Sequence, residues 1–479
     1  MKRLNELMDT DIDVEIKGIK INSKNVNPGD LFICTDMGTL DRHDFIDDAI
    51  ERGAAAIIVK KDVGEKSVPI IKVDNPNDYL PITCSKFYDE PEKKLKLIGV
   101  TGTDGKTTIA TMIQTLMGND ICGYIGTNGY NCSKFNKDTD NTTPDSDKLY
   151  GMFDEFVKAD CKYVSMEVCS EALMRGRVKN LEFDVSVISN ITREHLNIHG
   201  TLENYVASKN KIFSQTKKEG YCILNKDDEH FEESKAACHS KILTYGKDGD
   251  NDLYFKDVKL LFGASIFTFC FKGKEYKVKS NMAGLFNVYN LCAAILAMFA
   301  LGYKFEDFKD KIEKIKVPGR QAMIDLGQDF YVMVDFAHTP NGVLKILEYA
   351  KGLDVNRIIS VSGQPGERDK EKRKYVGKAL ADSSDYVIVT TDDPRSEDPK
   401  DIADMMMELV KDTYHSYEYI FDRREAIRKA INMAKPKDIV LLLGKGNEKY
   451  NKMDGWLQEI SDLKEATKAI EDRLKVEIK

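Results

Sequence analysis

A glycine-rich segment in the first quarter of the chain has the residue types that phosphate binding needs. Gly99–Thr108 reads GVTGTDGKTT; it follows a short apolar run and precedes a segment with helical periodicity. Gly102 and Gly105 would let backbone N–H groups approach phosphate oxygens at the helix N-terminus, where the helix dipole favours anions. Lys106 would reach the outer phosphates, and the Thr107 hydroxyl would bind Mg²⁺. The segment predicts a nucleoside-triphosphate site but leaves open whether the phosphoryl group passes to water, a hydroxyl or a carboxylate.

Two further polar residues follow strand-like runs, where open α/β sheets place their sites. Glu167 lies near the end of the run YVSMEV, and His195 follows the run DVSVIS. A carboxylate together with the Thr107 hydroxyl suits Mg²⁺, whereas imidazole is a less usual partner of that ion. Taken singly, Glu167 could equally be a surface acid and His195 a hydrogen-bonded loop histidine.

The elements that must position these residues fall into three blocks. The first runs to about residue 93 and holds short β-rich runs separated by turn signals such as Asn27-Pro28-Gly29-Asp30. The second alternates strands with helices, as βαβ units do. The third repeats this alternation with four apolar runs, FYVMVDF, RIISVSG, DYVIVTT and DIVLLLG. Such runs predict parallel strands covered on both faces, and hence an α/β fold.

Composition limits the class of protein. The chain has 479 residues, the length of two or three domains, and is 42% hydrophobic and 31% charged, as globular proteins are. Its 71 Lys and Arg against 79 Asp and Glu give a net charge of −8, which argues against a dedicated nucleic-acid binder. We expect no membrane span, because no apolar run of about 18 residues is present, and no signal peptide, because the N-terminal segment has no apolar h-region. The ten cysteines form no CxxC pair, so we expect reduced thiols in a cytoplasmic protein.

The phosphate loop is one of ten motifs that follow each other along most of the chain. In order they are GTDGKTT, NTTPDS, MEVCSEALMRGRV, NITREHLNIHGTLENYVASK, GLFNVYN, VPGR, VDFAHTP, GERDKEKR, DDPRSEDP and LLLGKGNEKY. Together they resemble the motifs of the Mur ligases, and within that family the MurE type, which adds an amino acid to a UDP-muramyl dipeptide. The resemblance implies three domains: a UDP-binding domain over 1–93, a central P-loop ATP-binding domain over 94–322, and a Rossmann-like amino-acid-binding domain over 323–479.

The same resemblance assigns residues to ATP and magnesium. ATP, the co-substrate, would bind Gly102, Thr103, Asp104, Gly105, Lys106, Thr107, Thr108, Asn287, Arg320 and Asp335. Magnesium would bind Thr107, Glu167, His195 and Lys209, the last as a carbamate, and the catalytic residues would be Lys106, Lys209, Glu167 and His195. The modification has an electrostatic reason. A free ammonium on Lys209 would repel Mg²⁺, whereas a carbamate is an anion and would attract it. Without the resemblance, Lys209 would be interpreted as an unmodified helix lysine.

The resemblance also implies the substrates and the reaction. The UDP-muramyl substrate would contact Ser23, Thr142, Thr143, Cys169 and Arg177. The incoming amino acid would contact Arg368, Asp392, Asp393, Pro394, Arg395, Gly444 and Glu448. ATP would phosphorylate the terminal carboxylate of UDP-MurNAc-L-Ala-D-Glu, and the amine would displace phosphate from the acyl phosphate to form an amide. This ATP-dependent ligation would serve peptidoglycan precursor synthesis, and the family resemblance implies a monomer whose partners are small molecules.

The segment that would select the amino acid is a hybrid. In the family, DNPR accompanies meso-diaminopimelate, while DNP or DDP followed by Ala or Asn accompanies lysine; this chain has DDPR. Arg395 favours a distal carboxylate, as in diaminopimelate. Asp393 favours an amine-terminated side chain such as that of lysine, and both arguments weaken if the two residues pair with each other. We take diaminopimelate as the first hypothesis and keep lysine open.

Other departures from the family pattern keep two alternatives open. Cys169 replaces a serine, Glu171 a histidine, Phe336 a tyrosine and Asn447 a histidine, whereas the ATP and metal motifs are intact. This pattern also fits a paralogue that joins an amino acid to a different nucleotide-linked or peptide substrate. A P-loop NTPase switch or kinase is the second alternative, but such proteins have no need of Lys209 or of an amino-acid pocket.

Overall fold

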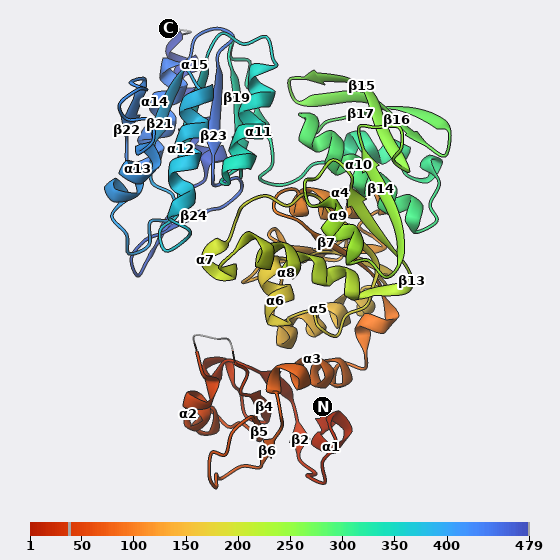
Figure 1. The fold of residues 1–479 in the computed structure, drawn as a ribbon. Coiled ribbons are helices and arrows are strands. Elements are labelled where there is room, and N and C mark those ends of the chain that lie inside the picture. Colours follow the sequence, from red (N-terminus) through yellow and green to blue (C-terminus); the bar gives the residue numbers. More distant parts are fainter. Residues whose placement is uncertain (37–39, 478–479) are drawn as a thin grey trace.

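The structure, a computed structural model, describes residues 1–36 and 40–477. Figure 1 shows three domains, each built around its own sheet. The sheets have four, eleven and six strands in chain order, and two further strand pairs lie outside them. The limits at residues 93 and 322 stay a prediction.

The N-terminal domain is a small parallel sheet with helices. Its elements are β1 (Lys2–Arg3), α1 (Leu4–Leu7), β2 (Glu15–Ile16), β3 (Gly18–Lys20), β4 (Asp30–Ile33), α2 (Ile46–Glu51), β5 (Ala56–Val59), β6 (Ile70–Lys72) and α3 (Pro76–Phe87). The sheet order is β3-β4-β5-β6, with every neighbouring pair parallel. Leu80 and Cys84 of α3 belong to the same apolar core as Leu149 and Phe153 of the central domain, so burial of apolar surface joins the two domains.

The central domain carries the longest sheet. Its elements are β7 (Lys96–Thr101), α4 (Lys106–Met117), β8 (Cys122–Gly126), β9 (Gly129–Cys132), β10 (Phe135–Lys137), α5 (Ser146–Lys158), β11 (Tyr163–Glu167), α6 (Ser170–Arg175), β12 (Phe183–Ile188), α7 (Leu196–His199), α8 (Leu202–Ser214), β13 (Thr216–Asn225), α9 (Phe231–Ala236), β14 (Lys241–Gly246), β15 (Leu253–Leu261), β16 (Ala264–Phe271), β17 (Lys274–Ser280) and α10 (Leu285–Ala300). The sheet order is β10-β9-β8-β11-β7-β12-β13-β14-β15-β16-β17.

The position of β7 in this sheet explains where the site lies. β7 pairs in parallel with β11 on one side and with β12 on the other. The connection that follows β7 leads to strands on one side of it, and the chain later crosses to β12 on the other side. The crevice beyond the carboxyl end of β7 is therefore a topological switch point, where open α/β sheets bind ligands. The phosphate loop follows β7, Glu167 ends β11, and His195 comes after β12.

The C-terminal domain confirms the predicted parallel sheet. Its elements are β18 (Ala322–Ile324), β19 (Tyr331–Asp335), α11 (Pro340–Lys351), β20 (Ile358–Ser362), α12 (Glu371–Ser383), β21 (Tyr386–Val389), α13 (Pro399–Met407), β22 (Tyr417–Tyr419), α14 (Arg423–Met433), β23 (Ile439–Leu443), β24 (Tyr450–Lys452), β25 (Leu457–Glu459) and α15 (Asp462–Glu477). The four predicted strands are β19, β20, β21 and β23, all parallel, and separate apolar clusters cover the two faces of the sheet.

Two expectations from composition can be compared with the structure. All ten cysteines are free thiols, as expected. Within the described residues, no helix combines the length and the apolar character that crossing a bilayer requires.

Candidate active site

The two glycines of the phosphate loop have positive φ and closely approach neighbouring side chains, so a residue with a Cβ would be strained at both positions. Gly102 has a φ of +139°, and a Cβ there would lie 1.9 Å from Ser189 Oγ. Gly105 has a φ of +89°, and its Cβ would lie 2.6 Å from Asn290 Oδ1. Lys106 begins α4 and folds back over the loop, donating from Nζ to two loop carbonyl oxygens at 2.8 and 3.0 Å. The loop therefore has the close backbone approach and the fixed cation that phosphate binding needs.

Glu167 and Thr107 meet beneath the loop. Thr107 Oγ1 donates to Glu167 Oε2 at 2.9 Å, although 60 residues separate them in sequence. The other carboxylate oxygen accepts from Tyr124 Oη at 2.6 Å and from the Thr127 amide at 2.8 Å. Glu167 is fully buried, and Arg320 Nη2 lies 3.3 Å from Thr107 Oγ1. The adjacent hydroxyl and carboxylate fit Mg²⁺, which prefers hard oxygen ligands.

Lys209 and His195 both have a pKa that the protein lowers. Lys209 is 1% exposed, and its Nζ donates to the Gly102 carbonyl at 2.6 Å and lies 4.5 Å from the centre of the Tyr205 ring. Burial, helped by the nearby charge of Lys106, holds the pKa of Lys209 well below its usual range. His195, directly before α7, is exposed at the surface. Desolvation by the surrounding protein and the positive charges of Lys209 and Lys106 nevertheless lower its pKa to about 3. A neutral imidazole and a neutral amine are the forms in which these groups can bind a metal or react.

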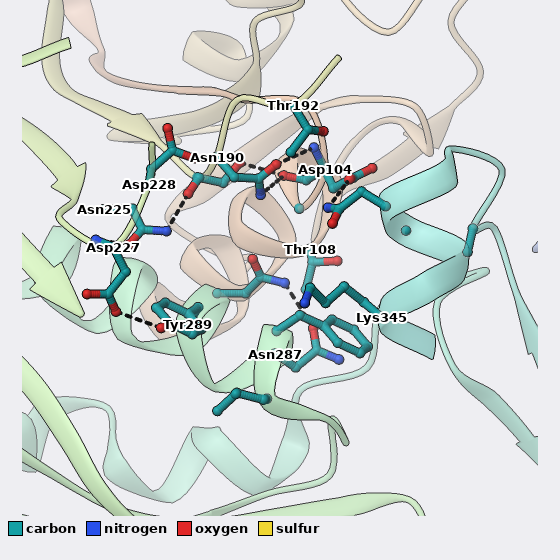
Figure 2. A pocket seen from close by; sticks show the side chains of 18 of the residues that line it. Asp104, Thr108, Asn190, Thr192, Asn225, Asp227, Asp228, Asn287, Tyr289 and Lys345 are labelled. Carbon is teal, nitrogen blue, oxygen red and sulfur yellow. Dashed lines mark hydrogen bonds between the residues drawn. The ribbon is translucent and has the colours of Figure 1, made fainter. Parts of the chain in front are cut away.

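A cavity of about 780 Å³ opens beside the loop, between the central and C-terminal domains. Figure 2 shows its lining, to which both domains contribute. Of the residues predicted to bind ATP, it includes Asp104, Gly105, Thr108, Asn287, Arg320 and Asp335. Gly102, Thr103, Lys106 and Thr107 do not line this cavity. The volume is in the range of small-molecule and cofactor sites.

Two aspartates at this cavity hold the domains together. Asp104 of the loop accepts hydrogen bonds from Thr339 Oγ1 at 3.0 Å and Asn341 Nδ2 at 3.1 Å, both at the start of α11. Asp335, whose contact with ATP stays a prediction, accepts the backbone amides of Gln321 and Ala337 on its two carboxylate oxygens at 2.8 and 2.7 Å. Asp335 thus fixes the segment that crosses from one domain to the other.

The cavity is also lined by polar residues that were not among the predicted site residues. Tyr289 Oη donates to Asp227 Oδ2 at 2.6 Å, and the two side chains point toward each other in Figure 2. Asn225 donates to the Ser189 carbonyl at 2.9 Å. Asn225 ends β13 and Asp227 follows it, so both reach the cavity because β13 lies beside β12, a pairing that the sequence does not reveal; Tyr289 comes from α10.

Four of the five residues predicted to contact the muramyl substrate gather beside Glu167. Thr143 Oγ1 donates to the Glu167 carbonyl at 2.9 Å and accepts from the Cys169 amide at 3.0 Å. Arg177 donates to the Thr143 carbonyl at 3.3 Å, and Thr142 Oγ1 lies 3.2 Å from Thr127 Oγ1. The fifth, Ser23, is buried in the N-terminal domain.

The residues predicted to bind the amino acid are only partly brought together. Asp392 and Asp393 are buried after β21, and Glu448 joins them from the loop after β23; their carboxylate oxygens lie within 4.8 Å of one another. Gly444, with a φ of +109°, lies against Asp392, because a Cβ there would be 2.6 Å from Oδ2. Arg368, in contrast, is exposed and forms no ion pair within the described part of the chain.

Arg395 and Asp393 do not form an ion pair in the described structure. Arg395 Nη1 donates to the Gly366 carbonyl, whereas Asp393 Oδ1 lies 2.8 Å from Lys445 Nζ. Lys445 was not among the predicted site residues. Its place in the sequence GKG, directly after an apolar strand, was a signal that could have indicated it.

Comparisons with known families cover all three domains. The Mur ligase middle domain matches residues 100–298, and the glutamate ligase domain of Mur ligases matches residues 319–446. A third match, the Mur ligase family catalytic domain, covers residues 15–88. The chain belongs to the Mur ligase family. It is therefore an ATP-dependent ligase with the three-domain architecture of that family.

Relatives of this Mur ligase match it over nearly the whole length. A protein of Fusobacterium nucleatum, named UDP-N-acetylmuramoyl-L-alanyl-D-glutamate–2,6-diaminopimelate ligase, is 37% identical, over 93% of this chain and 92% of its own. A protein of the same name from Geobacillus thermodenitrificans is 35% identical, over 96% of each chain. A second ligase of this kind, from Clostridium acetobutylicum, is 38% identical, over 93% of each chain.

Solved structures agree with the fold. A structure of a ligase of that name has a TM-score of 0.69 at 29% identity and covers 99% of both chains. The MurF ligase of Thermotoga maritima in complex with ADP has a TM-score of 0.65 at 20% identity, over 100% of both chains. At 20% identity, the similarity to the MurF structure shows a shared fold and nothing more.

Proposed function

We propose that this Mur ligase joins meso-diaminopimelate to UDP-MurNAc-L-Ala-D-Glu, with conversion of ATP to ADP and phosphate, in peptidoglycan precursor synthesis. One observation carries the proposal: relatives 35–38% identical, over at least 91% of this chain, are named as 2,6-diaminopimelate ligases of that substrate. The intact phosphate loop, the buried Glu167 and the cavity between the domains support the same reaction.

Phosphoryl transfer would take place at the phosphate loop. The γ-phosphoryl group would pass from ATP to an oxygen of the terminal carboxylate, giving an acyl phosphate and ADP. The amine nitrogen would attack the acyl carbon; the bond from that carbon to the phosphate oxygen would break, and the nitrogen would lose a proton as the amide forms. Lys106 and Arg320 supply fixed positive charge beside Thr107, and preorganised charge is usually the largest contribution to such catalysis.

Magnesium would be held by Thr107 and Glu167, with His195 and the carbamate of Lys209 as the further ligands that the family resemblance implies. When bound, the ion would neutralise negative charge on the phosphoryl oxygens. The chain itself fixes the carboxylate: Tyr124 Oη and the Thr127 amide donate to Oε1 of Glu167, while the hydroxyls of Thr107 and Thr127 donate to Oε2 at 2.9 and 3.4 Å. Hydrogen bonds of this kind orient a ligand and tune its affinity.

Carbamylation of Lys209 is part of the proposal. A carbamate forms when a neutral amine attacks CO₂ and releases a proton, so the reaction needs a lysine whose pKa is depressed. Burial keeps the pKa of Lys209 low in this way. The product would place a negative charge beside Lys106 and the phosphate loop, where the free amine now donates to the Gly102 carbonyl.

The contacts of Arg395 support diaminopimelate over lysine. Its guanidinium is bonded to a backbone carbonyl and not to Asp393, so it keeps donors for a distal carboxylate. Glu448 is half-buried near the same place and would take the ammonium of the amino acid. Both features fit an amino acid that carries a second carboxylate.

Phosphate release tests the proposal. With Mg·ATP and UDP-MurNAc-L-Ala-D-Glu, we expect meso-diaminopimelate to stimulate phosphate release strongly and L-lysine to do so weakly. Omission of the muramyl nucleotide should abolish the stimulation. Stimulation by an amino acid only with another acceptor would support the paralogue instead, an alternative that the replacement of serine by Cys169 motivates. A cytoplasmic location and a monomeric state also stay predictions.

A further inference from the structure

Lys445 is a buried cation at the centre of the proposed amino-acid site. Its side chain is 1% exposed, and its Nζ lies 2.8 Å from a carboxylate oxygen of Asp393 and 2.8 Å from one of Glu448. A third carboxylate, that of Asp392, is 3.5 Å away. A single ammonium therefore contacts all three acidic side chains of the site.

The position of Lys445 matters because three carboxylates this close together attract a cation. Their oxygens lie within 4.8 Å of one another, a spacing at which a metal ion or a substrate ammonium could bind. The chain supplies the cation itself, so the group keeps a net charge of −2 instead of −3. This charge acts strongly on a bound ligand because it is buried, and buried charges are screened much less than exposed ones.

Asp393 is directed into the protein. Besides Lys445, its Oδ1 accepts the backbone amide of Lys452 at 3.0 Å. Lys445 Nζ in turn donates to the Tyr450 carbonyl at 2.7 Å, and the Arg395 amide donates to the Lys452 carbonyl at 2.9 Å. Asp393 and Lys445 thus fasten β24 to the loop that carries Arg395.

We infer that Lys445 is a specificity-determining residue of this ligase, one that neutralises Asp393 and so leaves Arg395 to select an amino acid with a distal carboxylate. Asp393 is then a positioning residue that does not contact the substrate. The inference rests on the proposed function and adds to it the reason why an aspartate in this segment does not select lysine. Without Lys445 the pocket would gain a negative charge, which disfavours the distal carboxylate of diaminopimelate but not the side chain of lysine.

The test is the ratio of kcat/KM for meso-diaminopimelate to kcat/KM for L-lysine. Lys445→Met removes the charge with little change in length, and we expect the ratio to fall about tenfold or more. Asp393→Asn should leave the ratio at least as high as in the wild type, because Lys445 keeps Glu448 as a partner. The double variant restores the charge balance, and its ratio should return to within about threefold of the wild type.

Controls keep the outcomes distinct. Lys400→Met removes the same charge from an exposed pair with Asp404 and should not change the ratio. An unchanged ratio in a folded Lys445→Met protein that still binds ATP would overturn the inference, as would a tenfold fall in Asp393→Asn. If Lys445→Met does not fold, the kcat/KM ratios of Asp393→Asn and of the double variant test the inference, against the values expected for them above. A wild type without amino-acid-dependent phosphate release would instead refute the proposed function, and the inference with it.

Discussion

At the scale of single residues, Gly102 decides whether the phosphate loop can form. Its φ is +139°, and a Cβ at this position would lie 1.9 Å from the Ser189 hydroxyl oxygen and 3.2 Å from the Asn190 carbonyl oxygen, so a side chain would force Ser189 to move and would strain the backbone. We expect Gly102→Ala to lower the free energy of unfolding by about 3 kcal/mol, through overpacking and backbone strain together, and to abolish ATP binding. Urea unfolding and nucleotide titration measure the two effects.

Gly273 provides the control for this substitution. It also has a positive φ, +74°, but a Cβ there would meet no atom within 4 Å. Gly273→Ala should cost only the backbone strain, about 1 kcal/mol, and leave ATP binding unchanged. Equal costs for the two variants would contradict the role assigned to the contact between Gly102 and Ser189.

Lys209 gives a second prediction at this scale. Lys209→Gln and Lys209→Arg should both lower the rate of phosphate release at least about 100-fold, because neither residue can form a carbamate. Arginine keeps a positive charge, so substantial activity of Lys209→Arg would show that a cation is sufficient. With ¹³C-bicarbonate, a carbamate signal in the NMR spectrum should appear in the wild type and be absent from both variants.

The residues of the site differ in how well a sequence can reveal them. Thr107 and Glu167 lie within motifs at the ends of strands, and the structure places them 2.9 Å apart as hydrogen-bonded partners. Tyr124 lies in ordinary strand sequence, and only tertiary packing brings it to Glu167. Lys445 lies within a motif, but the sequence does not show that its ammonium contacts Asp393. Asp335 lies at the expected place, but the sequence could not show that backbone amides occupy both of its oxygens.

At the scale of elements, patterns of burial determine what could be predicted. β19, β20, β21 and β23 are apolar runs because helices cover both faces of their sheet, and they were predicted as parallel strands. The antiparallel extension β15-β16-β17 was not predicted, because no single periodicity runs through it: β17 alternates polar and apolar residues, β15 does so only in part, and β16 contains four consecutive buried residues. Strands β24 and β25 each have three residues, which is too short for a periodicity to appear in the sequence.

Helix α5 carries a carboxylate whose titration should affect stability. Asp147 has a buried oxygen, Oδ1, without a hydrogen-bond partner in the described structure. Burial, together with the neighbouring Asp145, raises its pKa to about 6. The unfolded chain would bind this proton only below about pH 4. Between these values the folded state binds more protons than the unfolded state, so this contribution to stability is present at low pH and is lost as pH rises through 6.

Asp147→Asn should remove this pH dependence. We expect the variant to gain unfolding free energy relative to the wild type at pH 8, and to gain less at pH 5, where the wild-type carboxyl is largely protonated. Urea unfolding at the two pH values measures the difference. A gain of the same size at both values would contradict the assigned pKa.

At the scale of the whole molecule, a buried ion pair joins the central and C-terminal domains. Lys372 Nζ of α12 lies 3.1 Å from Glu194 Oε1, and the two side chains are only 9% and 4% exposed. Removing one partner of a buried pair leaves the other charge uncompensated. We expect Lys372→Met to hinder the domain arrangement that brings amine and acyl phosphate together, and to lower kcat about tenfold or more. Phosphate release under saturating substrates measures the effect.

Lys378, on the same helix, provides the control. Its pair with Asp382 is exposed, and exposed pairs contribute little to stability. Lys378→Met should therefore leave kcat and thermal stability nearly unchanged. If both variants had the same kcat, the pair between Lys372 and Glu194 would have no role in bringing the domains together.

The central claim is that a central-domain phosphate loop and a C-terminal amino-acid site act together in a diaminopimelate-selective ligase. Competition tests it most directly: Mg·ATP, UDP-MurNAc-L-Ala-D-Glu and equal concentrations of meso-diaminopimelate and L-lysine, with the products identified by mass spectrometry. The account predicts that the diaminopimelate adduct predominates and that ADP forms in equal amount. A predominant lysine adduct would contradict the selectivity, and ADP formation without any adduct would contradict the ligase itself.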